Sequence, residues 1–179
     1  ATRSITSTAT NCLEGIRKIN KKIRYYNACT SECFGETKDL LADESTKFHP
    51  RSPYGSAKAT VFELVRHYRE NYNLFASSGI AFNHESPLRP ESFVTQKIIR
   101  EAKEIFHGNS QELRLGNIDI VRDWGWAPEY ARACNKILSS RKIDDYIMQN
   151  SITMHFCKFQ MSLNTPEKLC VASHHLVSS

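Results

Sequence analysis

The chain lacks long hydrophobic runs, clustered glycines and cysteines at metal-binding spacing. No apolar run approaches the roughly eighteen residues that a membrane-spanning helix needs. The six cysteines form no Cys-x-x-Cys pair, which argues against a zinc site or a disulfide framework and predicts a reducing, cytoplasmic compartment. All seven glycines are isolated, so the sequence contains no glycine-rich phosphate-binding turn. We therefore expect neither a membrane span nor a resident metal.

A strong charge of either sign is also missing. The 179 residues carry 24 Lys and Arg against 19 Asp and Glu, which gives a formal net charge of +5. A surplus this small is typical of a solvated surface and is compatible with an anionic substrate. The basic cluster at residues 21–24 is too short to indicate nucleic-acid binding.

Hydrophobic spacing predicts helices that alternate with strands. Such alternation is typical of an α/β fold, in which helices flank a parallel sheet. A long polar loop is expected over residues 35–53, and no element is predicted beyond about residue 150. The expected helices cover residues 5–19, 93–107 and 128–138, and a further helix begins at residue 54 and continues at least to residue 68. The expected strands cover residues 23–29, 74–82 and 113–115.

Two polar segments directly follow the best predicted strands. Thr30-Ser31-Glu32 follows the first, and Asn83-His84-Glu85 follows the second. Ligands of parallel α/β sheets bind at the carboxyl ends of the strands, so both segments are candidate site loops. An alternative for Thr30-Ser31-Glu32 is a purely structural one, in which these side chains cap the turn that follows.

Tyr54 and Lys58 lie four residues apart at the start of a predicted helix, which places them on one face. A nearby ammonium lowers the pKa of a tyrosine from about 10, and the phenolate can then act as a base. This spacing is short enough to arise by chance, and Tyr54 could equally be a packed aromatic side chain.

Longer segments around these residues resemble the GDP-mannose 4,6-dehydratase family of the extended short-chain dehydrogenase/reductase superfamily. The Tyr-x-x-x-Lys pair marks only the superfamily, whereas the Thr-Ser-Glu turn and Asn-His-Glu-Ser-Pro are more specific to this family. The resemblance runs in order from about residue 10 to residue 148. The matching segments are residues 27–35, 51–58, 82–91, 115–117 and 122–125.

The resemblance implies a partial Rossmann-type fold with the start of a smaller substrate-binding part. It assigns residues 1–90 to the distal part of an NADP-binding domain that carries the catalytic residues. Residues 91–148 would mix the substrate-binding part with the last Rossmann elements, and residues 149–179 form a divergent tail. Because the glycine-rich turn of the family is missing, we expect the chain to be the middle and distal part of a longer enzyme.

The family converts GDP-mannose to a 4-keto-6-deoxy sugar nucleotide, on the route to GDP-fucose, by internal redox with NADP and loss of water. The resemblance makes Tyr54 the base for the C4 hydroxyl and assigns Lys58 to lower its pKa and hold the nicotinamide ribose. It makes Glu32 the group that removes the C5 proton and protonates the leaving C6 hydroxyl, and Thr30 the hydrogen-bond donor to O4. If the alternation of the strand continues, Thr30 and Glu32 face the same side.

The resemblance also implies binding residues and partners. NADP would be bound by Tyr54, Lys58, His84 and Arg89, and the sugar nucleotide by Ser31, Asn83, Lys97 and Arg122. The family forms homo-oligomers, and no nucleic acid or membrane partner is expected. His84 could instead be structural, and Arg122 could form an ion pair with Asp119 or Asp123.

Two other functions remain open. The chain could belong to another nucleotide-sugar epimerase or dehydratase, although an epimerase that acts only at C4 does not need Glu32. It could also be an incomplete, non-catalytic chain.

Overall fold

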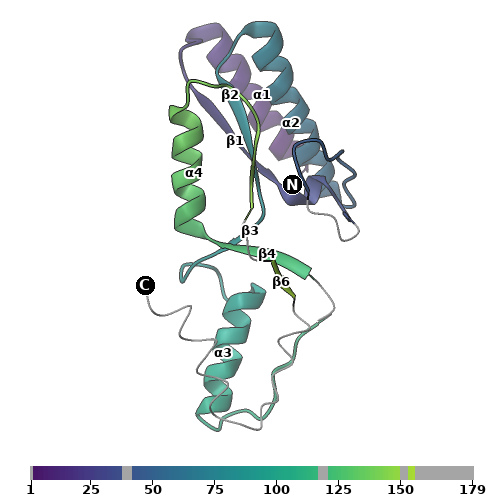
Figure 1. The fold of residues 1–179 in the computed structure, drawn as a ribbon, viewed down its shortest axis with the longest axis vertical. Coiled ribbons are helices and arrows are strands. Elements are labelled where there is room, and N and C mark those ends of the chain that lie inside the picture. Colours follow the sequence, from purple (N-terminus) through teal and green to yellow (C-terminus); the bar gives the residue numbers. More distant parts are fainter. Residues whose placement is uncertain (1, 38–41, 117–120, 150–152, 156–179) are drawn as a thin grey trace. The chain divides into compact units, whose positions relative to one another are not determined.

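The structure is a computed structural model that describes residues 2–37, 42–116, 121–149 and 153–155 (Figure 1). The chain divides into two compact units, which are considered separately. The first unit comprises Ala1–His84 and Gly125–Asn150, and the second comprises Glu85–Trp124 and Ser151–Ser179. Among the described helices, none combines the length and the apolar character that crossing a membrane would require.

The first unit contains a three-stranded parallel sheet with the order β1-β2-β5. Its strands are β1 (Tyr25–Thr30), β2 (Ala76–Ala81) and β5 (Tyr146–Met148). The register pairs Tyr25 with Ala76 and Thr30 with Ala81, so β1 and β2 end at the same edge of the sheet. Polar segments that follow these two strands therefore leave the sheet from one side.

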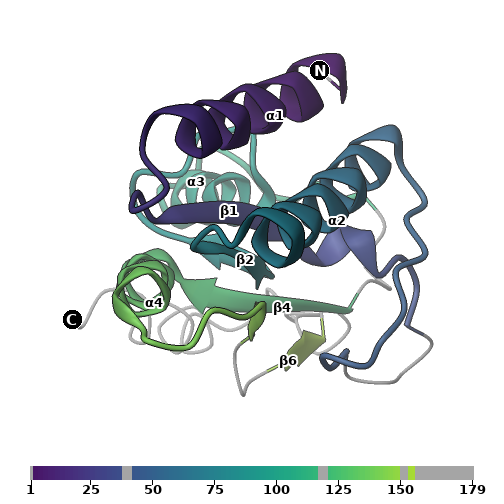
Figure 2. The ribbon, with the colours of Figure 1, turned by 90° about the horizontal axis from the view of Figure 1, so that it is seen from above.

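Helices cover both faces of this sheet. Figure 2 shows α1 (Thr2–Ile19) and α2 (Pro53–Tyr72) on one face and α4 (Ala127–Ser139) on the other. This three-layer arrangement buries both faces, as expected of a parallel sheet. The fold class predicted from the sequence is confirmed.

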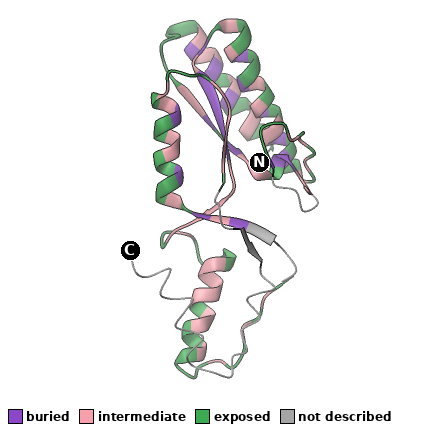
Figure 3. Cartoon of the chain, viewed as in Figure 1, coloured by how far each residue is buried: buried purple, intermediate pink, exposed green. Residues whose placement is uncertain are grey.

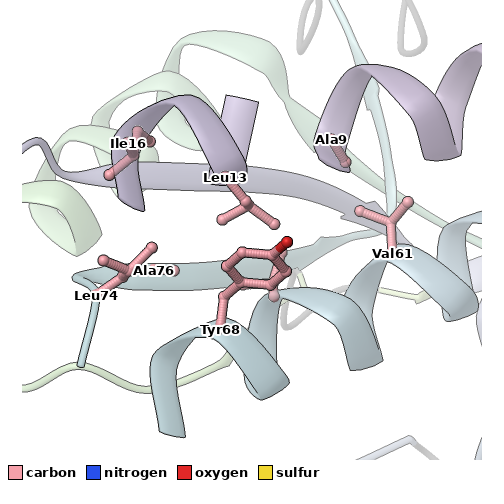
Figure 4. Close-up of a cluster of buried hydrophobic side chains, with 8 residues drawn as sticks. Ala9, Leu13, Ile16, Val61, Tyr68, Leu74 and Ala76 are labelled. Atoms are coloured by element: carbon pink, nitrogen blue, oxygen red, sulfur yellow. The ribbon is translucent and has the colours of Figure 1, made fainter. Parts of the chain in front are cut away.

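The main hydrophobic core lies between the two helices α1 and α2 and the sheet. Leu13 and Val65 are fully buried at its centre, and each such side chain contributes about 1.5–3 kcal/mol when it leaves water. Figure 3 shows that the buried residues of α1 and α2 lie along the sides that face each other and the sheet. The cluster consists of Ala9, Leu13, Ile16, Val61, Val65, Tyr68, Leu74 and Ala76 (Figure 4).

Both ends of α2 are marked by residues that favour the start or the end of a helix. Ser52 has an extended backbone, and its Oγ accepts a hydrogen bond from the Gly55 N–H at 3.0 Å. Pro53 occupies the first turn, where its missing N–H costs nothing. The helix ends at Asn73, which adopts the left-handed conformation with φ 55°.

A largely buried ion pair ties the end of α2 to the central strands. The Arg69 guanidinium donates two hydrogen bonds to the Asp145 carboxylate, at 2.6 and 2.9 Å, and one to the Ala76 carbonyl at 2.9 Å. Asp145 also accepts the Ser78 backbone N–H at 2.9 Å. Asp145 directly precedes β5, so these bonds connect α2, β2 and the start of β5.

The second unit contains α3 (Val94–Phe106) and a short antiparallel pairing between β4 (Val121–Trp126) and β6 (Thr153–His155). β3 (Asn83–Glu85) and β4 lie where the chain passes from one unit to the other, and the second sheet has the order β3-β4-β6. α3 is followed by Gly108, whose φ of 76° lies in the left-handed region.

Most predicted elements are confirmed, with bounds shifted by a few residues. The strand predicted at residues 113–115 is wrong, because this segment is irregular. The predicted loop at Asn83–Glu85 is also wrong, because these residues form β3. β3 and β5 have three residues each, which is too short for a hydrophobic alternation to be recognised from sequence.

We predict that Asp145→Asn destabilises the fold by about 2–3 kcal/mol, since it leaves the Arg69 charge largely buried without its carboxylate partner. Urea unfolding monitored by circular dichroism measures the change. Arg66→Gln is the matched control, because the Arg66–Glu63 pair on the same helix is about half exposed and should be worth less than about 1 kcal/mol. Equal losses in both variants would contradict this account.

Candidate active site

Four predicted catalytic residues converge at the carboxyl end of β1. Thr30 is the last residue of this strand, and Glu32 lies in the 3-10 turn Ser31–Cys33 that follows it. Tyr54 and Lys58 lie in the first turns of α2. The site therefore forms where the first turn of α2 contacts the turn after β1.

Gly55 allows this contact to be unusually close. A Cβ atom at Gly55 would lie 2.8 Å from the backbone oxygen of Glu32 and 3.2 Å from Cβ of Pro50, so a larger residue would push the helix away. The sulfur atoms of Cys29 and Cys33 fill the space beneath, and Cys33 Sγ lies 3.7 Å from the Gly55 carbonyl oxygen.

Glu32 is held through both its backbone and its side chain. Its N–H donates to Thr30 Oγ1 at 3.4 Å, so Thr30 does cap the turn as the structural alternative proposed. Its Oε2 accepts the Ser52 hydroxyl at 3.0 Å. The expectation that strand alternation puts Thr30 and Glu32 on one side is wrong, because β1 ends at Thr30 and the 3-10 turn begins at Ser31. The two residues are instead joined by the capping bond.

Lys58 is anchored to the strand rather than to the tyrosine hydroxyl. Its Nζ donates to the Ala28 carbonyl at 2.8 Å and lies 5.7 Å from the centre of the Tyr54 ring. Tyr54 is 43% exposed. Both side chains thus lie beside the end of β1, with Tyr54 open to a ligand.

The pKa of Tyr54 is raised, not lowered. Partial burial is the main cause, and the negative charge of Glu32 is the second. The prediction that Lys58 makes Tyr54 a ready phenolate is therefore wrong for the chain without ligands. The physical reasons are that burial disfavours the charged phenolate, that the Glu32 carboxylate adds to this effect, and that the Lys58 ammonium is bound to a backbone carbonyl.

Asn83 and His84 follow β2 at the same edge of the sheet and begin β3. The His84 ring lies 2.9 Å, at Nδ1, from the Phe82 carbonyl oxygen. It also stacks on Tyr130, with ring centres 4.7 Å apart. These contacts fix the His84 ring in place and favour the structural alternative for it, and its role toward a cofactor stays a prediction.

Three predicted binding residues belong to the second unit. Arg89 lies over the Phe93 ring, 3.6 Å from its centre, and forms an ion pair with Glu85 at 3.4 Å. Lys97 is the fourth residue of α3. Arg122 lies in β4, but its side chain, like the possible partner Asp119, falls outside the described residues. Their roles stay predictions, as does that of Ser31.

Sequence reasoning missed Ser52 and Gly55 as site residues. Ser52 bonds to Glu32, and Gly55 permits the close packing. The Ser-Pro pair at a helix start was a usable signal for the cap, but no sequence pattern shows that the same hydroxyl reaches a carboxylate twenty residues earlier.

The exposed Tyr54 and the partly exposed Lys58 fit a nicotinamide cofactor. They lie at the carboxyl edge of a parallel sheet, where dinucleotides bind in folds of this class. The described residues include no glycine-rich turn.

Solved structures share this fold. RMD from Pseudomonas aeruginosa complexed with NADPH has a TM-score of 0.79 at 20% identity, covering 86% of this chain and 54% of that one. dTDP-glucose 4,6-dehydratase from Bacillus anthracis in complex with NAD has a TM-score of 0.78 at 21% identity, covering 88% of this chain and 50% of that one. At such identities the likeness establishes the fold alone.

Sequence comparison gives a closer relationship. GDP-mannose 4,6-dehydratase from Sinorhizobium fredii is 45% identical over 143 residues, which is 79% of this chain and 41% of the relative. The human GDP-mannose 4,6 dehydratase is 44% identical over 126 residues, which is 70% of this chain and 34% of the relative. The chain thus spans about two fifths or less of the length of these relatives. Residues 2–169 match the family described as GDP-mannose 4,6 dehydratase. The chain belongs to the GDP-mannose 4,6-dehydratase family.

Proposed function

We propose that this chain carries the catalytic side chains of a GDP-mannose 4,6-dehydratase, which turns GDP-mannose into GDP-4-keto-6-deoxymannose. The observation that supports this most is the carboxylate of Glu32 beside Tyr54, held by hydrogen bonds at the edge of the sheet. A sugar epimerase needs a base only for O4, whereas removal of water across C5 and C6 also needs a group that removes the C5 proton.

Each side chain has a defined task in this proposal. Tyr54 takes the proton of the C4 hydroxyl, and a nicotinamide cofactor, when bound, would supply the hydride acceptor for the oxidation of C4 and the hydride donor for the reduction of C6. The C4 ketone makes the C5 proton acidic, and Glu32 removes it. Glu32 then gives this proton to the departing C6 hydroxyl, so that one water is lost, and C5 takes up a proton from solvent when C6 is reduced. Thr30 Oγ1 accepts the Glu32 N–H, which leaves its own O–H to donate to O4.

The two acid–base groups influence each other. Glu32, while ionised, raises the pKa of Tyr54 and so holds the phenol proton in the chain without ligands. Protonation of Glu32 by the C5 proton removes that charge. Burial is the larger cause of the raised pKa of Tyr54, and loss of the Glu32 charge would remove only the smaller contribution.

We further propose NADP as cofactor, GDP-mannose as substrate, a homo-oligomer and a cytoplasmic location. The relatives' names support the substrate, and solved structures of this fold with bound NAD or NADPH support a nicotinamide cofactor. The four described cysteines are free thiols, which suits a reducing compartment. This proposal also includes the division of the chain into an NADP-binding part up to about residue 90, a mixed part up to about residue 148 and a divergent tail.

We predict that Tyr54→Phe, in the complete native protein, lowers kcat for GDP-mannose at least 100-fold, because general-base catalysis is typically worth 10²–10⁴-fold. The melting temperature should change little, since the Tyr54 side chain is 43% exposed and only a hydroxyl is lost. Product is quantified by mass spectrometry. A variant that keeps half of the wild-type rate would show that Tyr54 is not the base.

Glu32→Gln tests the dehydratase assignment itself. Glutamine keeps the size of the side chain and can still accept the Ser52 hydroxyl, but it cannot take up a proton. We expect the variant to oxidise C4, visible as reduced-nicotinamide absorbance on adding GDP-mannose, and to release almost no 4-keto-6-deoxy product. Near wild-type product formation would make Glu32 a turn residue and favour an epimerase or another sugar-nucleotide enzyme.

The same substitution should lower the pKa of Tyr54. Glu32 is one of the causes that raise this pKa, so the neutral amide should make the phenol ionise at lower pH. Carbon-13 NMR of labelled tyrosine resolves the titration, and Tyr54→Phe assigns the signal. Glu63→Gln, on the exposed part of α2, is the control and should leave the Tyr54 curve unchanged. An unchanged curve in Glu32→Gln would contradict the coupling.

A further inference from the structure

The Ser52 hydroxyl makes two hydrogen bonds, one as acceptor and one as donor. Its Oγ accepts the Gly55 N–H at 3.0 Å, which starts α2, and its O–H donates to Glu32 Oε2 at 3.0 Å. A serine hydroxyl has one proton to donate, so both bonds can form together only with the proton on the Glu32 side. The hydroxyl therefore links the first turn of α2 to the carboxylate.

This link leaves one carboxylate oxygen open. Oε2 of Glu32 is occupied by Ser52, whereas Oε1 accepts no hydrogen bond from any of the residues that the structure describes. The backbone of Glu32 is fixed separately, by Thr30 Oγ1 on its N–H and by the close approach of Gly55 to its carbonyl. Of these contacts, the bond from Ser52 is the one that restrains the side chain.

We propose that Ser52 is a positioning residue for the dehydration step, which holds Glu32 by Oε2 so that Oε1 is presented to the substrate. The inference rests on the proposed role of Glu32. Proton transfer needs its partners within about 3 Å, and a carboxylate on a freely rotating side chain spends little time in one such position. Ser52 thus acts on C5 chemistry through Glu32, and it does not act on the oxidation of C4.

Substitutions at Ser52 can separate its role as a helix cap from its hydrogen bond to Glu32. Glycine at an N-cap costs only a few tenths of a kcal/mol relative to serine, so Ser52→Gly removes the bond to Glu32 and largely spares the helix. Threonine keeps both the donor and the acceptor, so Ser52→Thr restores the link. Thr60→Gly destabilises the same helix on an exposed face, without any bond to Glu32, and is the matched control.

The experiment measures kcat and KM for GDP-mannose, the rate of C4 oxidation and the melting temperature in the complete native protein. We expect Ser52→Gly to lower kcat about 10- to 150-fold, the factor that a hydrogen bond to a charged group is worth, with KM and C4 oxidation within about threefold of wild type. Ser52→Thr should recover most of kcat, and Thr60→Gly should lower only the melting temperature.

Combination with Glu32→Gln separates this inference from the proposed function. If Ser52 acts through Glu32, Ser52→Gly should have no further effect on dehydration once Glu32 is Gln. An inactive Glu32→Gln with a fully active Ser52→Gly would overturn the role of Ser52 alone. Equal loss of C4 oxidation and dehydration in Ser52→Gly would also overturn it, because Ser52 would then only start the helix that holds Tyr54. A fully active Glu32→Gln would overturn both proposals.

Discussion

The close contact between the first turn of α2 and the turn after β1 determines the geometry of the whole site. It depends on Gly55, because any side chain there would collide with the Glu32 carbonyl at 2.8 Å. The contact brings together two segments that are twenty residues apart, so that one side contributes Glu32 and the other contributes Tyr54 and Lys58. Without it, neither the bond from Ser52 to Glu32 nor the electrostatic coupling of Glu32 to Tyr54 could form.

The remainder of the first unit holds α2 in this position. Along its length the helix packs Val61 and Val65 against α1 and β2, and at its end Arg69 is bonded to Asp145. Lys58 adds a bond from the helix to the backbone of β1. Because the helix is fixed to the sheet at several points, the active-site groups at its start are carried by a rigid element and not by a loop.

The alternation of helices and strands was predictable from the sequence. The hydrophobic spacing and Pro53 predicted the helix that begins near residue 54, and the placement of Glu32 after a strand and of Tyr54 at a helix start predicted that they lie near one edge of the sheet. The direction in which the pKa of Tyr54 shifts was not predictable, since it depends on burial and on which charge lies nearest in space. The spacing to Lys58 suggested a lowered value, but the lysine is bonded to Ala28 instead. The double role of Ser52 likewise needs coordinates, because a helix cap looks the same in sequence whether or not it also contacts a carboxylate.

Solvent deuterium at C5 of the product is the most direct test of the central claim that this contact assembles a dehydratase. The complete native protein is incubated with GDP-mannose in deuterated water, and the product is analysed by NMR after a short reaction time. Product left in the same solvent without protein corrects for spontaneous exchange. We expect a 4-keto-6-deoxy sugar nucleotide with deuterium at C5, because the original C5 proton leaves with the water that is lost and C5 is reprotonated from solvent when C6 is reduced. A product that keeps its original C5 hydrogen and its C6 hydroxyl would contradict it.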